Sequence, residues 1–155
     1  MQTLQVKPIG WILSGVKRDR DDSWKEVSAE IRLDESQFGP ESLSGLAEFS
    51  HVEVLFLFDQ LAESEVESKT RHPRENVKWP KVGIFAQRGR KRPNRIGATI
   101  CELLGVDGAS IRVRGLDAFD GSPVLDIKPV MAEFLPEKGS VRQPRWSREL
   151  MSTYF

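Results

Sequence analysis

Residues 51–58 read HVEVLFLF, a mostly apolar run. Such a run is typical of a strand that is covered on both faces or that lines a closed barrel. Residues 27–33 (VSAEIRL) instead alternate between apolar and polar side chains, which predicts a strand with one buried face. Further strands are predicted at residues 4–13, 82–86, 97–106, 109–114 and 123–130.

Turn signals separate several of these strands. The dipeptides Asp107-Gly108 and Asp120-Gly121 favour tight hairpin turns. Only residues 40–49 predict a helix in the main part of the chain, because Pro40 suits a first helical turn and apolar residues follow it. Many short strands and few helices predict an all-β fold, and closure into a barrel would remove exposed strand edges.

The chain is expected to form one domain followed by a tail. Its 155 residues are enough to bury a core without disulfides or a structural metal. Residues 1–135 would form the barrel domain, and residues 136–155 a tail that packs on the barrel or on a partner subunit. Trp146, Leu150 and Tyr154 stand at helical spacing and predict a short helix in the tail.

Composition excludes several classes of protein. The formal net charge is +0, so overall charge does not drive an encounter with nucleic acid. The one cysteine, Cys101, excludes an intramolecular disulfide framework and is expected to be a buried thiol. His51 and His72 are far apart and have no cysteine partners, so no metal site is expected. Neither a signal-peptide layout nor an apolar run of about 20 residues is present, so we expect a cytoplasmic protein that does not enter the membrane.

Residues 72–97, HPRENVKWPKVGIFAQRGRKRPNRIG, concentrate positive charge in an otherwise neutral chain. Pro73, Pro80 and Pro93 restrict the backbone, which lowers the entropic cost of fixing the arginine side chains. Fixed guanidinium groups suit phosphate or carboxylate recognition, because the planar fork donates two parallel hydrogen bonds. An anion-binding segment is the sharper interpretation, and a solvated basic loop is the alternative.

The motifs of several large enzyme classes are absent: the chain has no GxGxxG, Walker loop, GxSxG or HExxH.

Three stretches of the chain stand in the order of motifs in a known family. They are FSHVEVLFLFDQ, HPRENVKWPKVGIFAQRGRKRPNRIG and GLDAFDGSPVLDIKP. The chain resembles, over residues 9–130, the TrmO family, whose members are also called TsaA-like or YaeB-like. These proteins are dimeric tRNA methyltransferases that use S-adenosylmethionine, built on a small single-sheet antiparallel β-barrel. They methylate N6 of the threonylcarbamoylated adenosine beside the anticodon.

The resemblance implies S-adenosylmethionine as cofactor, no metal, a tRNA substrate, a homodimer and two sets of site residues. The cofactor set comprises Asp59, Gln60, Arg88, Ala98, Arg114, Gly115, Leu116 and Asp117. The basic residues left for tRNA phosphates are Arg74, Arg90, Lys91, Arg92 and Arg95. Longer family members have a histidine where Asp59 stands, which changes the charge near the cofactor.

The proton on the methylated nitrogen needs an acceptor, and Asp126 in the LDIKP motif is the candidate catalytic residue. A surface ion pair is the alternative, since Asp126 and Lys128 share one face of a strand. Two other functions also stay open: a non-catalytic RNA-binding barrel module, and a methyltransferase with a different substrate.

Overall fold

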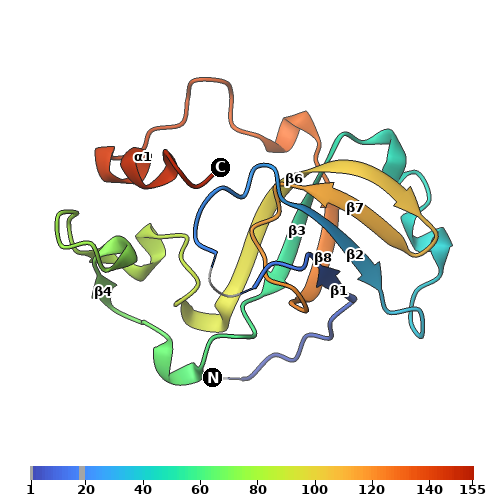
Figure 1. Cartoon of the computed structure of the whole chain (residues 1–155), viewed down its shortest axis with the longest axis horizontal. Helices are drawn as coiled ribbons and strands as arrows, with labels where there is room; N and C mark the ends of the chain where they lie inside the picture. The colour runs from blue at the N-terminus through green and yellow to red at the C-terminus, as the bar shows by residue number, and fades with distance from the viewer. Residues whose placement is uncertain (1, 18–19) are drawn as a thin grey trace.

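Six antiparallel strands close into a barrel in the order β1-β2-β7-β6-β3-β8 (Figure 1). The structure is a computed structural model that describes residues 2–17 and 20–155. Residues 1, 18 and 19, which the predicted domain 1–135 includes, lie outside the described residues. The barrel strands are β1 (Gly10–Leu13), β2 (Ser28–Leu33), β3 (His51–Leu57), β6 (Ile96–Asp107), β7 (Ser110–Arg114) and β8 (Pro123–Pro129). The predicted all-β antiparallel barrel is confirmed.

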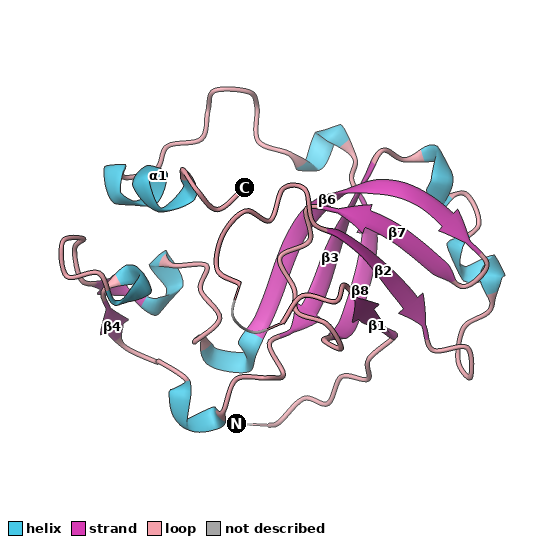
Figure 2. Cartoon of the chain, viewed as in Figure 1, coloured by secondary structure: helices cyan, strands magenta, loops and turns pink. Residues whose placement is uncertain are grey.

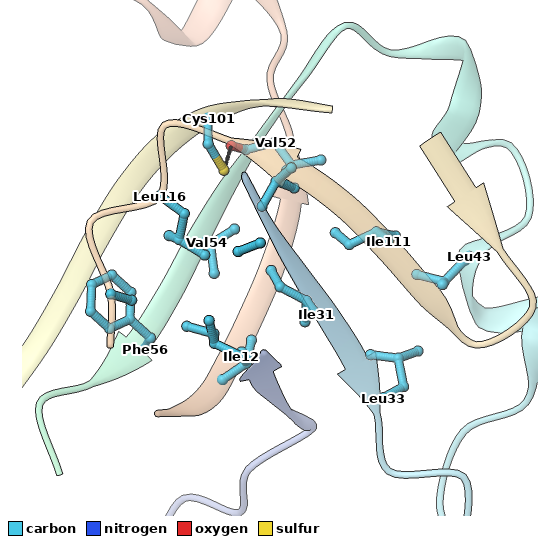
Figure 3. Close-up of a cluster of buried hydrophobic side chains, with 14 residues drawn as sticks. Ile12, Ile31, Leu33, Leu43, Val52, Val54, Phe56, Cys101, Ile111 and Leu116 are labelled. Carbon is cyan, nitrogen blue, oxygen red and sulfur yellow. Dashed lines mark hydrogen bonds between the residues drawn. The ribbon is translucent and has the colours of Figure 1, made fainter. Parts of the chain in front are cut away.

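Alternate side chains of each strand fill the barrel. Val52, Val54 and Phe56 of β3 point inward and are at most 1% exposed. They meet inward residues of the other strands, such as Ile12 of β1 and Ile31 of β2 (Figure 3). The period-2 alternation of the sequence therefore places one apolar face of every strand in a single core.

Gly97 of β6 pairs with Phe56 of β3 and receives its ring. A Cβ atom at position 97 would lie 2.7 Å from Cε2 and 2.8 Å from Cε1 of Phe56, which is closer than van der Waals contact allows. The Phe56 ring also meets Phe58 edge to face, with ring centroids 5.1 Å apart. The glycine of the RPNRIG motif thus makes room for the largest side chain of the core.

Loops and short helices make up the rest of the molecule, on one side of the barrel and at its ends (Figure 2). Strands β4 (Thr70–Arg71) and β5 (Val82–Gly83) form a separate two-stranded ribbon. The 3₁₀ turns are Pro40–Leu43, Leu46–Glu48, Glu63–Glu65, Pro73–Glu75, Ile84–Ala86, Pro93–Arg95 and Ala132–Phe134. The only α-helix in the described ranges is α1 (Arg145–Met151), and no helix there is long and apolar enough to cross a membrane.

Three predicted elements were wrong in extent or kind. The helix expected at residues 40–49 is two 3₁₀ turns, because Gly45 between them takes a left-handed φ of 80°. The strand expected at 82–86 pairs only over Val82–Gly83, after which Ile84 turns inward and is 3% exposed. In the N-terminal stretch 4–13, only Gly10–Leu13 enters the barrel.

The tail returns to the body of the molecule through its last residues. Helix α1 lies beside the region that carries β4 (Figure 1), where Trp79 Nε1 donates to Glu149 at 2.8 Å. The predicted helical run to Tyr154 was too long, since α1 ends at Met151. Beyond α1, the backbone nitrogens of Ser23 and Trp24 donate to the carbonyls of Thr153 and Tyr154 at 3.0 and 2.8 Å.

Candidate functional site: a charged pocket beside the barrel

A pocket of about 480 Å³ lies between the barrel and the loops. This volume falls within the range of small-molecule sites in proteins. The lining comes from segments far apart in the sequence: Arg20, Asp21, Trp24, Phe58, Arg71, Arg74, Glu75, Ile84, Gln87, Arg88, Gly89, Arg90, Lys91, Asp117, Phe119 and Tyr154. Basic side chains outnumber acidic ones among these residues, so the pocket favours a ligand that carries an anionic group.

Arg88 is placed to receive such a group. Its guanidinium donates to the carbonyl of Ala98 in β6, which ties the loop after the 3₁₀ turn Ile84–Ala86 to the barrel. Within the described ranges, Arg88 forms no ion pair with a carboxylate. The side chain is exposed, so most of its donors remain free for a ligand. Two predicted cofactor residues, Arg88 and Ala98, are therefore in direct contact.

Asp117 is an acidic residue in the wall of the same pocket as Arg88. Its Oδ1 accepts a hydrogen bond from the Thr99 hydroxyl and its Oδ2 accepts one from the Tyr154 hydroxyl. Burial raises the pKa of Tyr154, and the negative charge of Asp117 adds to that effect, so the tyrosine keeps its proton and donates. The two hydroxyl donors therefore fix the orientation of the Asp117 carboxylate on the pocket wall.

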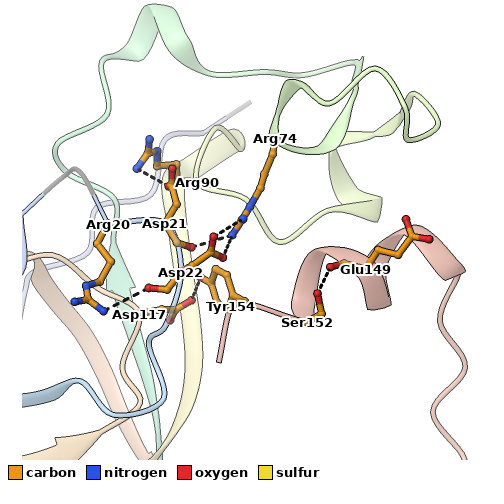
Figure 4. A network of polar contacts seen from close by, with 9 residues as sticks. All are labelled: Arg20, Asp21, Asp22, Arg74, Arg90, Asp117, Glu149, Ser152 and Tyr154. Atoms are coloured by element: carbon orange, nitrogen blue, oxygen red, sulfur yellow. Dashed lines mark hydrogen bonds and ion pairs between the residues drawn. The ribbon is translucent and has the colours of Figure 1, made fainter.

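A polar network beside the pocket joins Arg74 to the 20–24 loop and to the tail (Figure 4). Arg74 donates to both carboxylate oxygens of Asp22, at 2.7 and 3.1 Å, and to the carbonyl of Asp21 at 2.8 Å. The hydrogen bonds from Arg74 lower the pKa of the Asp22 carboxyl. The same guanidinium lies 5.7 Å from the centroid of the Tyr154 ring. Arg90 stands 4.0 Å from an Asp21 oxygen and 5.7 Å from the Phe119 ring.

The residues predicted to contact RNA divide into two groups. Arg74, Arg90 and Lys91 line the pocket, and Lys91 forms an ion pair with Glu75 at 3.3 Å. Arg92 and Arg95 do not line it. Arg92 donates to the carbonyl of Gln87 at 2.9 Å, and Arg95 donates to the carbonyl of Leu61 at 2.8 Å.

Asp59 and Gln60 line a small hollow next to the pocket. This hollow shares Phe58, Arg90 and Phe119 with the pocket, so the predicted strand-end residues are neighbours of the main site. Gln60 Nε2 donates to the carbonyl of Asp120 at 3.0 Å, which ties the end of β3 to the Asp-Gly turn.

The other predicted residues do not line the pocket. Arg114 forms an ion pair with Glu102 at 2.5 Å. Leu116 is 0% exposed in the barrel core, and Gly115 makes the turn before it with a φ of 87°. Asp126 forms an ion pair with Lys128, the alternative that its strand position indicated. Of the turn 114–117, Asp117 alone lines the pocket.

Several lining residues carried no clear signal in the sequence. Phe119 stands inside the motif GLDAFDG, in which the aspartates and not the phenylalanine predicted a site. Asp21 belongs to the charged run KRDRDDSWK, which is typical of a solvated loop, as does Asp22, which does not line the pocket but pairs with Arg74. Tyr154 lies in the tail, where helical spacing pointed to packing. In the described ranges, no group of three His, Cys, Asp or Glu residues could hold a metal ion.

Comparison with known proteins assigns the family. The family model described as the tRNA-methyltransferase O N-terminal domain matches residues 19–134. The chain belongs to this family. It is 40% identical over 129 residues to a probable S-adenosyl-L-methionine-binding protein of Methanothermobacter thermautotrophicus, with 81% of the chain and 89% of that protein covered.

Other members of the family are longer. A mouse tRNA (adenine(37)-N6)-methyltransferase is 44% identical over 93 residues, which cover 60% of the chain and 21% of the mouse protein. The crystal structure of TrmO from P. aeruginosa superposes with a TM-score of 0.75 at 29% identity, covering 94% of the chain and 62% of that structure. The chain thus spans about a fifth of the mouse relative and under two thirds of the solved TrmO chain.

Proposed function

We propose that the chain is an S-adenosylmethionine-dependent tRNA methyltransferase that methylates N6 of threonylcarbamoyladenosine next to the anticodon. The observation that carries the proposal is one pocket that brings together the guanidinium of Arg88, the carboxylate of Asp117 and the ring of Phe119. The names of the archaeal and mouse relatives, which refer to S-adenosylmethionine and to tRNA, support the same function.

The donor set of the pocket fits the methyl donor. The methionine part of S-adenosylmethionine ends in a carboxylate, for which the planar fork of Arg88 is a suitable partner. Its sulfonium is positively charged and is favoured beside a carboxylate such as Asp117. Phe119 offers an aromatic face to the adenine. When bound, S-adenosylmethionine supplies an activated methyl group, and the protein's part is mainly to position the acceptor nitrogen.

Replacement of Arg88 tests this assignment. Arg88→Ala is expected to raise the dissociation constant for S-adenosylmethionine about tenfold, because it removes the charged partner of the carboxylate. Lys78→Ala removes a charge from the same basic segment outside the pocket and is the matched control. Equal affinities for the two variants in a calorimetric titration would remove Arg88 from the binding site.

For the tRNA we propose phosphate contacts from the basic residues Arg74, Arg90, Lys91, Arg92 and Arg95. Arg92 and Arg95 lie outside the pocket with backbone partners, so their remaining donors can meet phosphates without breaking an ion pair. Arg74 and Lys91 have carboxylate partners in Asp22 and Glu75, which a phosphate would have to replace. A salt titration of tRNA affinity measures this contribution, since each lost phosphate contact lowers the slope.

Asp126 remains our proposal for the proton acceptor. Its motif supports the proposal, whereas its ion pair with Lys128 and its place outside the pocket favour a structural role. Asp126→Asn keeps the shape of the side chain and removes its basicity. Unchanged turnover and unchanged cofactor affinity in this variant would end the catalytic assignment.

We also propose that the protein is a cytoplasmic homodimer. Along the outer face of β6, the apolar residues Ile96, Ile100 and Leu104 are 41%, 45% and 38% exposed, and a second copy would cover them. Ile100→Glu is expected to shift the mass measured by light scattering from dimer to monomer. A monomeric wild-type protein would contradict the proposal.

The decisive assay for function compares methyl incorporation into tRNA with and without the threonylcarbamoyl group. Methylation that requires the group supports the proposed reaction. Methylation of both tRNAs, or of neither despite cofactor binding, would indicate a methyltransferase with another substrate. Binding of tRNA without any binding of S-adenosylmethionine would indicate a non-catalytic RNA-binding module.

A further inference from the structure

The C-terminal tail supplies one residue to the pocket, Tyr154. The backbone hydrogen bonds from Ser23 and Trp24 to the carbonyls of Thr153 and Tyr154 dock the end of the tail on the 20–24 loop. This places the Tyr154 side chain on the wall of the pocket next to Asp117, 37 positions away in sequence. No function assigned above uses this side chain.

The side-chain donors to Asp117 are hydroxyl groups and not cations. Asp117 is held by two hydroxyl groups, those of Thr99 and Tyr154, one on each carboxylate oxygen. Within the described residues, no lysine or arginine forms an ion pair with it, although several line the same pocket. Hydroxyl donors orient a carboxylate but do not cancel its charge, so the negative charge stays available to a ligand.

The position of Tyr154 is itself enforced from the other side. Arg74 lies over its ring, and the double hydrogen bond from Arg74 to Asp22 fixes that guanidinium (Figure 4). The Tyr154 hydroxyl is a donor at neutral pH, and burial raises its pKa further above that range. The loops, the tail and β6 therefore combine to hold one uncancelled carboxylate in a basic pocket.

We propose that Tyr154 is a positioning residue that holds Asp117 as an uncancelled carboxylate, so that the pocket prefers a positively charged methyl donor to its neutral thioether product. The inference rests on the proposed function. Loss of the methyl group converts the sulfonium of S-adenosylmethionine into the uncharged sulfur of S-adenosylhomocysteine. The two molecules share their carboxylate, ammonium, ribose and adenine, so the carboxylate of Asp117 acts on the difference between them.

Calorimetric titrations with both molecules test the inference. The quantity is the preference, defined as the dissociation constant for S-adenosylhomocysteine divided by that for S-adenosylmethionine. Tyr154→Phe removes only the hydroxyl and is expected to lower the preference about fivefold, mainly through weaker binding of S-adenosylmethionine. Asp117→Asn is expected to lower it at least as much. In the Asp117→Asn background, Tyr154→Phe should have no further effect, because Tyr154 acts through Asp117.

Two further variants separate positioning from folding. Trp79→Phe deletes the hydrogen bond from the Trp79 ring to the carboxylate of Glu149. Glu149 belongs to the same tail as Tyr154, and neither Trp79 nor Glu149 lines the pocket. The Trp79→Phe variant should keep the wild-type preference. Thr99→Val removes the second donor to Asp117 and should lower the preference in the same direction, which keeps the inference testable if Tyr154→Phe folds poorly.

The outcomes are distinguishable. A wild-type preference in Tyr154→Phe, or equal weakening of both ligands, would overturn the inference and leave the proposed function standing. The same would follow if Tyr154→Phe lowered the preference by the same factor with Asn at position 117. A wild-type chain that binds neither molecule would overturn the proposed function and the inference with it.

Discussion

The barrel and the pocket are built from opposite kinds of contact. Inside the barrel, apolar side chains such as Val54 and Val113 are 0% exposed. Pairing between the strands provides hydrogen-bond partners for the backbone N–H and C=O groups. Around the pocket, arginines and carboxylates meet across loops, and Arg74 and Glu75 take left-handed φ values of 49° and 60°. Apolar burial dominates folding free energy, whereas exposed ion pairs contribute little to it. The difference indicates that the barrel provides stability and the loops provide recognition.

The largest expected loss of stability comes from removing a phenylalanine from the barrel, and the same change in the loops is its control. Phe56→Ala in the barrel should lower the free energy of unfolding by about 3–5 kcal/mol, because it leaves a cavity beside Gly97 and Phe58. Phe85→Ala in the loops should change it by less than about 0.5 kcal/mol, since that side chain is 77% exposed. Urea denaturation measures both. Similar losses would refute the division of roles.

Two glycines sharpen the comparison at a smaller scale. Gly97→Ala should lower the free energy of unfolding by about 1–3 kcal/mol, because its methyl group would press on the Phe56 ring. At Gly89, a pocket-lining residue, an added Cβ meets nothing within 4 Å. Gly89→Ala should therefore leave stability nearly unchanged in the same denaturation experiment. A large loss of unfolding free energy in Gly89→Ala would contradict the open space around this position.

A pH titration of stability reports on the buried thiol of the barrel. Burial raises the pKa of Cys101 from 9.0 to about 12. Above pH 9 the unfolded chain releases this proton and the folded chain keeps it, so stability is full below pH 9 and falls as pH rises toward 12. We expect a loss of about 1 kcal/mol per pH unit from this group. Burial also raises the pKa of Tyr154, so this hydroxyl adds to the loss of stability at pH values above its ordinary pKa.

The control for this titration is Cys101→Ala, which removes the thiol. Its stability at neutral pH will be lower because of lost packing, but its decline above pH 9 should be less steep than that of the wild type. Parallel curves would show that Cys101 does not account for the alkaline loss.

A pocket ion pair is expected to contribute only a small part of the stability. The side chains of Arg74 and Asp22 are 32% and 38% exposed, so Arg74→Ala should cost about 0.5 kcal/mol of unfolding free energy. The cost should shrink further at about 1 M salt, where screening is strong. Circular dichroism melts at low and high salt compare the two. A loss as large as that of Phe56→Ala would place part of the stability in the loops.

The sequence allowed much of the barrel to be predicted, because each strand carries its own pattern. The alternation in residues 27–33 and the apolar run in 51–58 follow from which side chains face the core. Closure of the sheet encloses these inward side chains and leaves no unpaired strand edge. The short element at Ile84 was missed, since an apolar run alone does not distinguish a strand from a turn that buries one side chain.

The pocket was only partly predictable. Arg88 and Asp117 were identified through the family resemblance, which carried information that local patterns lack. Tyr154, Asp21 and Asp22 were missed, because their roles depend on contacts between segments far apart in the chain. Such contacts arise from loop geometry and pairwise hydrogen bonds, and neither has a periodicity that a sequence reveals.

The most direct test of the account is a crystal structure of the chain grown with S-adenosylmethionine. The account predicts electron density for the cofactor in the pocket beside the barrel, with its carboxylate at Arg88 and its sulfonium on the side of Asp117. Density on another face of the barrel, with this pocket vacant at saturating cofactor, would contradict the assignment of recognition to these loops.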